Sequence, residues 1–440
     1  MTWFAFFSAF FAWFGIAPMM VVIREEMHLT KDEVGWTIIA SVAVTVFARF
    51  FIGWLCDRIG PRLSYTYLLL FGAIPVAGIG FADSFESFLV FRLLIGIIGA
   101  SFVITQYHTS VMFAPNVVGQ ANATSAGWGN LGGGVTQMVM PLMFSAFVIG
   151  FGFTDAEAWR ASMVVVGTVI FFTGIAYFFL TQDAPDGNFK ELREKGMLPE
   201  KKQVTGAYFQ AMKDYRIWIL FVIYGACFGI ELTVNNVAAL YFFDYFHVDM
   251  VTAGLIAACF GLMNIFARTL GGIFADNCAS LWGLKGRSYW LFIVLLAEGF
   301  ALMLFSQMSV LFLAIPTLIL FSLCTQMAEG ATYSVVPFMN KKALGAVSGV
   351  VGAGGNAGAV AAGFLFKGSM DWNEVFFVIG VVVAIASFLT FFLRFTPEQE
   401  REERIAFETA HMDVLQAKVV EANQAVERSE KIISDAKAGV

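Results

Sequence analysis

Charged residues are scarce in this chain. Only 14% of its 440 residues are Asp, Glu, Lys or Arg, whereas 58% are hydrophobic. A soluble globular domain carries about one charged residue in four and close to equal shares of polar and apolar residues. The composition therefore excludes an ordinary soluble domain and indicates a chain that is solvated by lipid.

Cysteine is also scarce and forms no motif. None of the five cysteines has CxxC spacing, which argues against a disulfide framework and a metal site. His108 has no second metal ligand at helical spacing, and no Lys-Ser or Lys-Thr pair follows the glycine clusters, which excludes a phosphate-binding P-loop. With no cofactor motif or catalytic constellation, the sequence predicts a protein that is not an enzyme and has no cofactor, no metal and no nucleic-acid partner.

Long apolar segments dominate what is present. A bilayer core needs about twenty apolar residues per helix, and twelve such segments predict an all-α polytopic membrane protein. They span residues 2–23, 34–56, 63–82, 87–113, 118–148, 159–181, 215–243, 250–275, 288–306, 308–335, 343–366 and 373–394. The polar stretch 182–213 predicts a cytoplasmic linker between an N-terminal six-helix bundle, residues 1–181, and a C-terminal one, residues 214–394.

The short loops predict the orientation. With both termini inside, thirteen Lys and Arg residues fall in the inner loops, and only Arg24, Lys31, Arg160 and Lys367 fall outside. Because cytoplasmic loops are enriched in Lys and Arg, both termini are predicted to face the cytoplasm, with the chain in the plasma membrane.

A charged tail, residues 395–440, follows the last apolar segment. Its apolar residues fall largely on a spacing of three or four, which predicts one face of a cytoplasmic helix: Met412, Leu415, Val419, Ala422, Val426 and Ile433. The pattern leaves open whether this helix is solvated, docks on its own bundle or pairs with another chain.

An internal repeat relates the two bundles. The pattern FARxxxGxxxD occurs in the second and eighth apolar segments, 219 residues apart, and a glycine-rich stretch around an asparagine occurs in the fifth and eleventh, 226 residues apart. Because both separations are close to half the chain, one duplication explains them. The repeated residues are Arg49, Gly53 and Asp57 with Arg268, Gly272 and Asp276, and Gly129 and Asn130 with Gly355 and Asn356.

This organisation resembles the major facilitator superfamily, whose two homologous bundles hold substrate near the bilayer midplane where they meet. The stretch from Gly53 to Arg62 resembles the superfamily's cytoplasmic loop motif, and Arg92-x-x-x-Gly96 resembles its RxxxG element. The resemblance implies the major facilitator fold, with two pseudo-symmetric bundles. It implies gating or structural roles, rather than substrate contact, for Gly53, Asp57, Arg58, Arg62, Arg92, Gly272 and Asp276.

Arg49 and Arg268 are placed where charge is unfavourable. A charged side chain in hydrocarbon costs about 2.5 to 3.5 kcal/mol unless it faces a polar cavity or a partner. Both arginines lie fifteen to eighteen residues from the outer ends of their segments, a depth of about 22 to 27 Å in a helix. Their repeat positions predict that they face each other across the pseudo-two-fold axis. Because no equivalent pair of carboxylates accompanies them, the cavity between the bundles is predicted to select an anion.

The type of side chain narrows the choice of anion. Guanidinium is planar, always protonated and donates parallel hydrogen bonds, which suits flat nitrate or bent nitrite better than tetrahedral phosphate. The amides of Asn130 and Asn356 are predicted to donate to anion oxygens. The glycine spacings Gly129 to Gly133 and Gly354 to Gly358 are also explained by close helix packing alone, and both interpretations stay open.

At these positions the chain resembles the nitrate/nitrite porter family, which includes bacterial NarK-like proteins and plant and algal nitrate transporters. That family's two glycine-rich nitrate signatures, two substrate-binding arginines and helix 7 aromatic residue all have counterparts here. The resemblance implies an anion site formed by Arg49, Arg268, Asn130, Asn356, Tyr224, Gly129 and Gly355.

The predicted function is secondary active transport of nitrate, nitrite or both by alternating access, performed by a monomer in the lipid bilayer. Glu231 and Glu329 are candidates for proton coupling, because carboxyls inside membrane proteins often carry protons; an ion pair with an arginine is the alternative. Proton symport, nitrate/nitrite exchange and uniport stay open. The alternative functions are a carrier for another small organic anion and an anion sensor that signals through the tail.

Overall fold

The computed structural model of the chain is built from helices. It describes residues 1–113, 118–197, 212–339 and 344–401, together with residues 404, 405, 416, 419 and 423. Within these residues, twelve helical segments are long and apolar enough to cross a membrane, which confirms the predicted number. Large apolar side chains remain on the outer surface, such as Phe81 at 86% exposure and Phe312 at 82%. Soluble monomers avoid large apolar patches, so this surface suits lipid.

The N-terminal half holds the first six segments. In chain order they are α1 (Thr2–Phe14), η1 (Ala17–Met19) and α2 (Met20–Glu26); α3 (Lys31–Ile59); α4 (Pro61–Gly78) and η2 (Ile79–Phe81); α5 (Phe85–Gly96), η3 (Ile97–Ala100) and α6 (Ser101–Met112); α7 (Val118–Phe151); and α8 (Asp155–Leu180). The short helix α9 (Phe189–Glu194) follows in the predicted linker, and residues 198–211 of that linker lie outside the described residues.

The C-terminal half holds the other six. They are α11 (Tyr215–Phe246); α12 (Met250–Leu262), η4 (Met263–Ile265) and α13 (Ala267–Trp282); α14 (Leu284–Ser306); α15 (Leu311–Val335) and η5 (Val336–Phe338); α16 (Leu344–Lys367); and α17 (Trp372–Ser387) with η7 (Phe388–Phe392).

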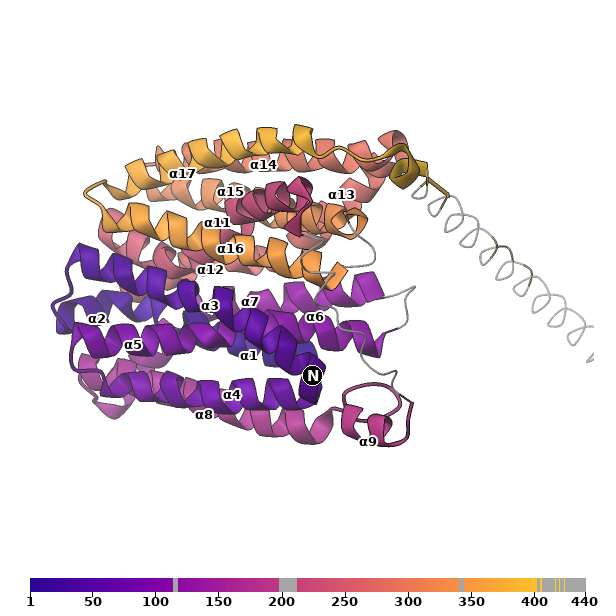
Figure 1. Cartoon of the computed structure of the whole chain (residues 1–440). Helices are drawn as coiled ribbons and strands as arrows, with labels where there is room; N and C mark the ends of the chain where they lie inside the picture. Colours follow the sequence, from indigo (N-terminus) through magenta and orange to yellow (C-terminus); the bar gives the residue numbers. More distant parts are fainter. Residues whose placement is uncertain are drawn as a thin grey trace, which may run out of the picture.

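Successive segments run back and forth along the molecule, so their connections alternate between two ends (Figure 1). The terminal end carries the N-terminus, α9 and the start of the tail after Phe392. The distal end carries the connections 27–30, 82–84 and 152–154.

The two halves meet along two pairs of helices. α3 packs against α16, and α7 packs against α12. α3 and α16 are the second and eleventh membrane segments, and α7 and α12 are the fifth and eighth. Because the second and eighth are repeat-related, as are the fifth and eleventh, the duplication makes these two contacts equivalent. Glycine allows the second approach, because a Cβ built on Gly261 of α12 would lie only 2.2 Å from the Gly134 Cα of α7.

Capping boxes fix several helix starts at the distal end. The Glu33 backbone N–H donates to the Thr30 hydroxyl, and the Thr30 backbone N–H donates to the Glu33 carboxylate; Thr154 and Glu157 form the same pair. The helices therefore begin at Lys31 and Asp155. These starts precede the apolar segments expected near residues 34 and 159 by one polar turn, which an apolar pattern does not detect.

The eighth segment is interrupted at the level of Arg268. α12 ends at Leu262, a turn of 3₁₀ helix follows, and α13 begins at Ala267 after Phe266, whose φ is −134°. The repeat-related helix α3 runs without a break through Arg49. Interrupted helices mark binding sites in many transporters, because the break lets a side chain point into the space between the bundles.

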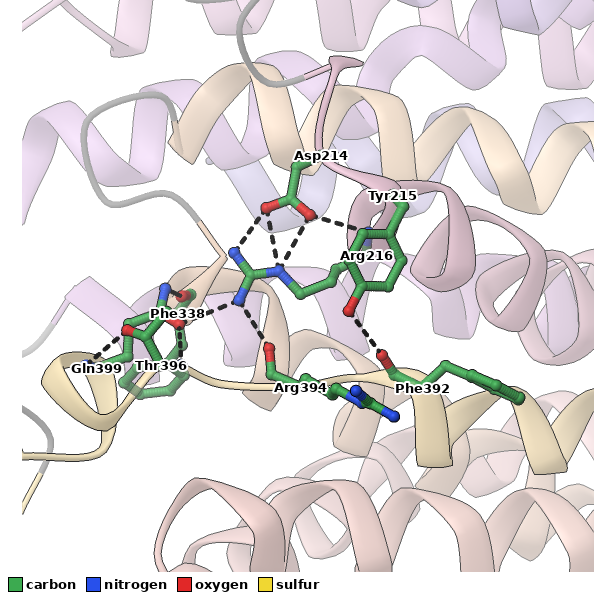
Figure 2. A network of polar contacts seen from close by, with 8 residues as sticks. All are labelled: Asp214, Tyr215, Arg216, Phe338, Phe392, Arg394, Thr396 and Gln399. Carbon is green, nitrogen blue, oxygen red and sulfur yellow. Dashed lines mark hydrogen bonds and ion pairs between the residues drawn. The ribbon is translucent and has the colours of Figure 1, made fainter.

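The first residues of the tail are held against the terminal end of the C-terminal half (Figure 2). Arg216 Nη1 donates to the Arg394 carbonyl at 2.9 Å and to Gln399 Oε1 at 3.0 Å, and Gln399 Nε2 donates to the Phe338 carbonyl at 3.0 Å. Burial acts to raise the pKa of Asp214, but hydrogen bonds from Arg216 outweigh it, so the net pKa lies below its ordinary value. The Asp214 carboxylate therefore stays charged and orients Arg216.

Most of the predicted tail helix lies outside the described residues. Of its predicted apolar positions, only Val419 is described; it is helical and 58% exposed. The amphipathic helix stays a prediction.

Ion pairs between the two halves lie at the distal end. Arg24 of α2 forms two hydrogen bonds with Asp244 of α11, at 2.7 and 2.8 Å, and Lys367 of α16 pairs with Asp32 of α3 at 3.2 Å. Within the described ranges, no ion pair joins the halves at the terminal end. The structure is thus a conformation in which the distal end is closed.

Candidate functional site

Arg49 reaches from α3 of the N-terminal half to α16 of the C-terminal half. Its side chain is buried, with 6% of the residue exposed. Nη1 donates to the Gly352 carbonyl at 2.7 Å, whereas Nε and Nη2 have no hydrogen-bond partner. In the described part of the chain, no carboxylate forms an ion pair with it. Arg49 is therefore a buried cation with free donors at the junction of the two halves.

Arg268 occupies the equivalent place at the start of α13 and is 9% exposed. Nη2 donates to the Tyr224 hydroxyl at 2.8 Å, and Nη1 lies 2.9 Å from Glu329 Oε2. The pair with Glu329 lacks hydrogen-bond alignment, because both atoms remain without a hydrogen-bond partner. Arg268 is therefore neutralised, although loosely, whereas Arg49 is not.

One aromatic ring lies beside both arginines. The guanidinium carbon of Arg49 is 5.7 Å from the centre of the Phe228 ring, and that of Arg268 is 5.8 Å from it. Tyr224 stacks on Phe228 with ring centres 5.0 Å apart, and Phe102 lies 5.5 Å from Arg49. The structure thus brings the two predicted arginines together within an aromatic enclosure, which excludes water and strengthens their pull on an anion.

The two repeat-related asparagines are fully buried. Asn130 on α7 and Asn356 on α16 are both 0% exposed, and neither the Oδ1 nor the Nδ2 of either has a hydrogen-bond partner. An unsatisfied buried amide costs about 1 to 3 kcal/mol. Asn356 lies one helical turn from Gly352, whose carbonyl binds Arg49. The role of both amides as donors to an anion stays a prediction.

The signature glycines serve close packing. A Cβ built on Gly129 would lie 1.7 Å from the Phe6 ring, and one on Gly355 would lie 2.3 Å from the Phe228 ring. Both positions therefore require glycine for space. Of the two interpretations that the sequence left open, the geometry favours packing, with Gly355 shaping the site by admitting Phe228.

Among the described residues of the C-terminal half, three carboxyls are buried. Glu329 pairs with Arg268, with Glu329 Oε2 at 2.9 Å from Arg268 Nη1. Glu231 accepts from Asn264 Nδ2 at 2.7 Å. Glu298 accepts from the Thr325 hydroxyl at 3.1 Å. Only the first of them contacts a site arginine directly.

The loop motif organises the terminal end of the N-terminal half. The Arg62 backbone donates to Asp183 at 2.8 Å, and Arg62 Nε donates to the Phe178 carbonyl at 2.7 Å. The Arg58 carbonyl accepts from Arg193 at 2.8 Å. These contacts tie the start of α4 to the end of α8 and to the linker, a structural arrangement far from Arg49.

The remaining motif residues have mixed surroundings. Asp276 pairs with Arg287 at the terminal end of α13. No atom lies within 4 Å of a Cβ built on Gly272, and the nearest to one on Gly53 is at 3.8 Å, so packing explains neither glycine. The side chain of Asp57 lies outside the described set.

Arg92 is not part of the loop cluster. It lies on α5, is 1% exposed and donates to Asn236 Oδ1 of the other half at 3.0 Å.

Sequence reasoning missed several residues of the site. Phe228, Phe102 and Tyr333 form its aromatic wall, with Tyr224 and Tyr333 ring centres 5.0 Å apart. The sequence has 49 phenylalanines, so no pattern distinguishes these rings from those that face lipid. Asn264 was detectable, because it is a polar residue just before the repeated FAR motif.

Comparison with known proteins places this geometry in a class. A family model described as the Major Facilitator Superfamily matches residues 2–339. The crystal structure of a bacterial homologue of the human lysosomal transporter Spinster, in an inward-facing and unoccupied conformation, matches with a TM-score of 0.70 at 15% identity, over 90% of this chain and 97% of that one. The chain is a transporter of the major facilitator superfamily, with its fold.

Two relatives with higher sequence identity indicate which family of the superfamily this chain belongs to. The chain is 41% identical over 399 residues to high affinity nitrate transporter 2.5 of Arabidopsis thaliana, covering 90% of this chain and 79% of that protein. It is 30% identical over 447 residues to the nitrate/nitrite transporter NrtP of a Picosynechococcus strain, covering 82% and 83%. Within the superfamily, the chain belongs to the family of nitrate and nitrate/nitrite transporters, as the sequence motifs predicted.

Proposed function

We propose that this protein carries nitrate, and also nitrite, across the plasma membrane by alternating access, with one anion held between Arg49 and Arg268. The observation that carries the proposal is the buried, unneutralised guanidinium of Arg49 beside Arg268 and Phe228. The Arabidopsis relative is named for nitrate, and the Picosynechococcus relative for nitrate and nitrite.

The charge of the site favours an anion. Among the described carboxylates, only Glu329 forms an ion pair with a site arginine, at 2.9 Å from Arg268 Nη1. One paired carboxylate therefore stands against two guanidiniums. The net positive site is also flat, because the free Nε and Nη2 of Arg49 form a planar fork between aromatic faces. A planar trigonal oxyanion matches that fork.

We place both termini on the cytoplasmic side, so that the distal end is the outer one. The excess of Lys and Arg in the terminal-end loops supports this orientation. With the outer end closed by the Arg24–Asp244 pair, the conformation is one in which the anion exchanges with the inside.

Proton symport is the mode that the geometry supports best. Arg268 is neutralised by Glu329, so an incoming anion competes with that carboxylate. A proton on Glu329 releases Arg268 for the anion, and deprotonation on the inside restores the pair and weakens anion binding. Proton and anion therefore bind and leave together, which is the requirement for coupling.

Replacement of either arginine by lysine tests the anion site. Arg49→Lys and Arg268→Lys keep the charge and remove the planar fork, and each is expected to abolish nitrate-dependent growth. Arg160→Lys is the matched control, because Arg160 pairs with Glu26 at the outer end; growth should be normal. Full activity in both site variants would contradict the proposal.

Glu329→Gln tests coupling. A neutral amide leaves Arg268 permanently unpaired, so nitrate should still exchange for nitrite in proteoliposomes while an imposed pH gradient no longer drives uptake. Glu298→Gln is the control, because Glu298 is equally buried but bonded to Thr325. Normal pH-driven uptake by Glu329→Gln would show that the proton travels elsewhere.

Two other functions are separated by simple assays. Competition of labelled nitrate uptake by small carboxylates would reveal a carrier for organic anions. Removal of residues 402–440 would abolish a sensor's signalling while leaving nitrate uptake unchanged. We expect no competition by carboxylates at equal concentration, and unchanged uptake after the truncation.

A further inference from the structure

A third buried arginine lies at the interface of the two halves. Arg92 is 1% exposed, and its Nε and Nη1 have no hydrogen-bond partner. Its one hydrogen bond runs from Nη2 to Asn236 Oδ1 at 3.0 Å. An arginine so deeply buried normally has a carboxylate partner, but no carboxylate of the described residues forms an ion pair with it.

Three helices from both halves converge on Arg92. It lies on α5, and Asn236 lies on α11 of the other half. The hydroxyl of Ser41 on α3 donates to the Ile38 carbonyl at 2.7 Å and lies 3.4 Å from the same Asn236 oxygen. Asn236 Nδ2 donates to the Leu232 carbonyl at 2.9 Å. The cluster is therefore a polar island in which the only charge is a cation.

The position of the cluster along the transport path follows from helix geometry. Ser41 precedes Arg49 on α3 by eight residues, which is about 12 Å of helix, so the cluster lies outward of the central site. Asp244, the outer partner of Arg24, follows Asn236 on α11 by another eight residues, again about 12 Å. Arg24, Arg92 and the central arginines thus lie at three levels along the interface, and of these Arg24 is neutralised by Asp244.

Packing alone does not explain an arginine here. A structural arginine elsewhere in this protein uses all three of its nitrogens: Arg160 bonds Glu26 and three backbone carbonyls. Arg92 leaves two of its three nitrogens without a partner. Its only bond crosses the interface and must break when the halves separate at the outer end, which would expose the whole guanidinium to the path.

We propose that Arg92, with Asn236 and Ser41, forms a second, outer binding site for the transported oxyanion, which holds the ion before it moves to the central pair. This inference rests on the proposed function. The ion is bound by the planar guanidinium when the outer end opens. When the outer end closes, Asn236 Oδ1 again accepts from Arg92 Nη2 and displaces the anion from that nitrogen. The displaced anion then moves inward to the central arginines.

Nitrate-induced thermal stabilisation of the purified full chain tests this site. A ligand that binds only the folded state raises the melting temperature, and gluconate at equal ionic strength controls for salt. Removing the central site with the double variant Arg49→Gln, Arg268→Gln should reduce the nitrate-induced shift without abolishing it. Adding Arg92→Gln should then reduce the shift to zero.

A second variant covers the possibility that Arg92→Gln does not fold. Asn236→Asp is nearly isosteric and gives Arg92 a carboxylate partner that repels an anion, so in the double-variant background it should also abolish the residual shift. Asn373→Asp is the matched control, because Asn373 is bonded to Tyr245 away from Arg92; the residual shift should persist.

The outcomes separate the two proposals. A full parental shift in the double variant would overturn the central site, whatever Arg92 does. No shift in the double variant, or a residual shift that Arg92→Gln and Asn236→Asp leave unchanged, would overturn the outer site while leaving the central one intact.

Discussion

Arg49 and Arg268 hold repeat-related positions but have different surroundings. Arg268 donates to the Tyr224 hydroxyl and is paired with Glu329, whereas Arg49 donates only to the Gly352 carbonyl. The unneutralised charge of the site therefore belongs to the N-terminal half. In the proposed mechanism, Arg49 is the permanent ligand and Arg268 is the one whose availability changes with protonation.

Asn356→Leu separates anion binding from packing. Both amide atoms of Asn356 are buried without a partner, so an apolar residue of similar volume should raise the free energy of unfolding or leave it unchanged, within about 1 kcal/mol. Loss of the amide donor should raise the nitrate KM about tenfold, since tenfold is about 1.4 kcal/mol.

The control for that variant is Asn373→Leu. Asn373 donates to the Tyr245 hydroxyl at 2.8 Å, so this change should lower the melting temperature and leave KM unchanged. If Asn356→Leu keeps the parental nitrate KM, measured from initial uptake rates, Asn356 does not contribute to anion binding.

The two arginines and the two asparagines could be proposed from the sequence, because the internal duplication places each residue type at equivalent positions in both halves. The pairing of Glu329 with Arg268 was one of two sequence interpretations, and only the fold decides it, since the two residues are 61 positions apart. The bond of Arg92 to Asn236 was not predictable. The RxxxG resemblance suggested a gating or structural role, and nothing in a single segment reveals its partner across the interface.

At the scale of helices, the apolar pattern located all twelve segments but not their breaks. α12 and α13 read as one continuous apolar run, although a turn of 3₁₀ helix separates them just before Arg268. Next to this break, Gly261 of α12 packs closely against Gly134 of α7. The same helix contact gives a testable consequence.

Gly261→Ala should impair transport through packing alone. The added Cβ would lie 2.2 Å from the Gly134 Cα, and overpacking typically costs about 1 to 3 kcal/mol. If that cost falls on conformations in which α7 and α12 touch, the transport rate drops about tenfold or more.

Gly272→Ala is the comparison within the same membrane segment. No atom lies within 4 Å of its added Cβ, so transport by this variant should remain within about twofold of the parent. Equal loss in both variants, measured as initial uptake in vesicles, would show that the α7–α12 contact is not the cause.

At the scale of the whole molecule, the ion pairs between halves at the distal end stabilise one side of the alternating cycle. Arg24 and Asp244 are partly buried, with side chains 27% and 20% exposed, and they border a cavity of about 150 Å³ between the halves. Reversing either charge should disfavour the outer-closed state by about 1 to 2 kcal/mol, a factor of about 5 to 30 in population.

The measurement is the rate at which a membrane-impermeant thiol reagent labels Cys introduced at Ile38, which also lines that cavity. Arg24→Asp and Asp244→Arg should each speed labelling. The double variant restores an ion pair and should return the rate to that of the parent, with the five native cysteines measured as background. Additive acceleration in the double variant would show that the pair does not hold the halves together.

Counterflow in proteoliposomes tests the central claim most directly. Vesicles loaded with unlabelled nitrite and given trace labelled nitrate outside should accumulate label transiently with the parent protein. They should accumulate none with Arg49→Lys or Arg268→Lys, although both variants remain folded. Counterflow at the parental rate in both lysine variants would contradict an anion held between two guanidiniums.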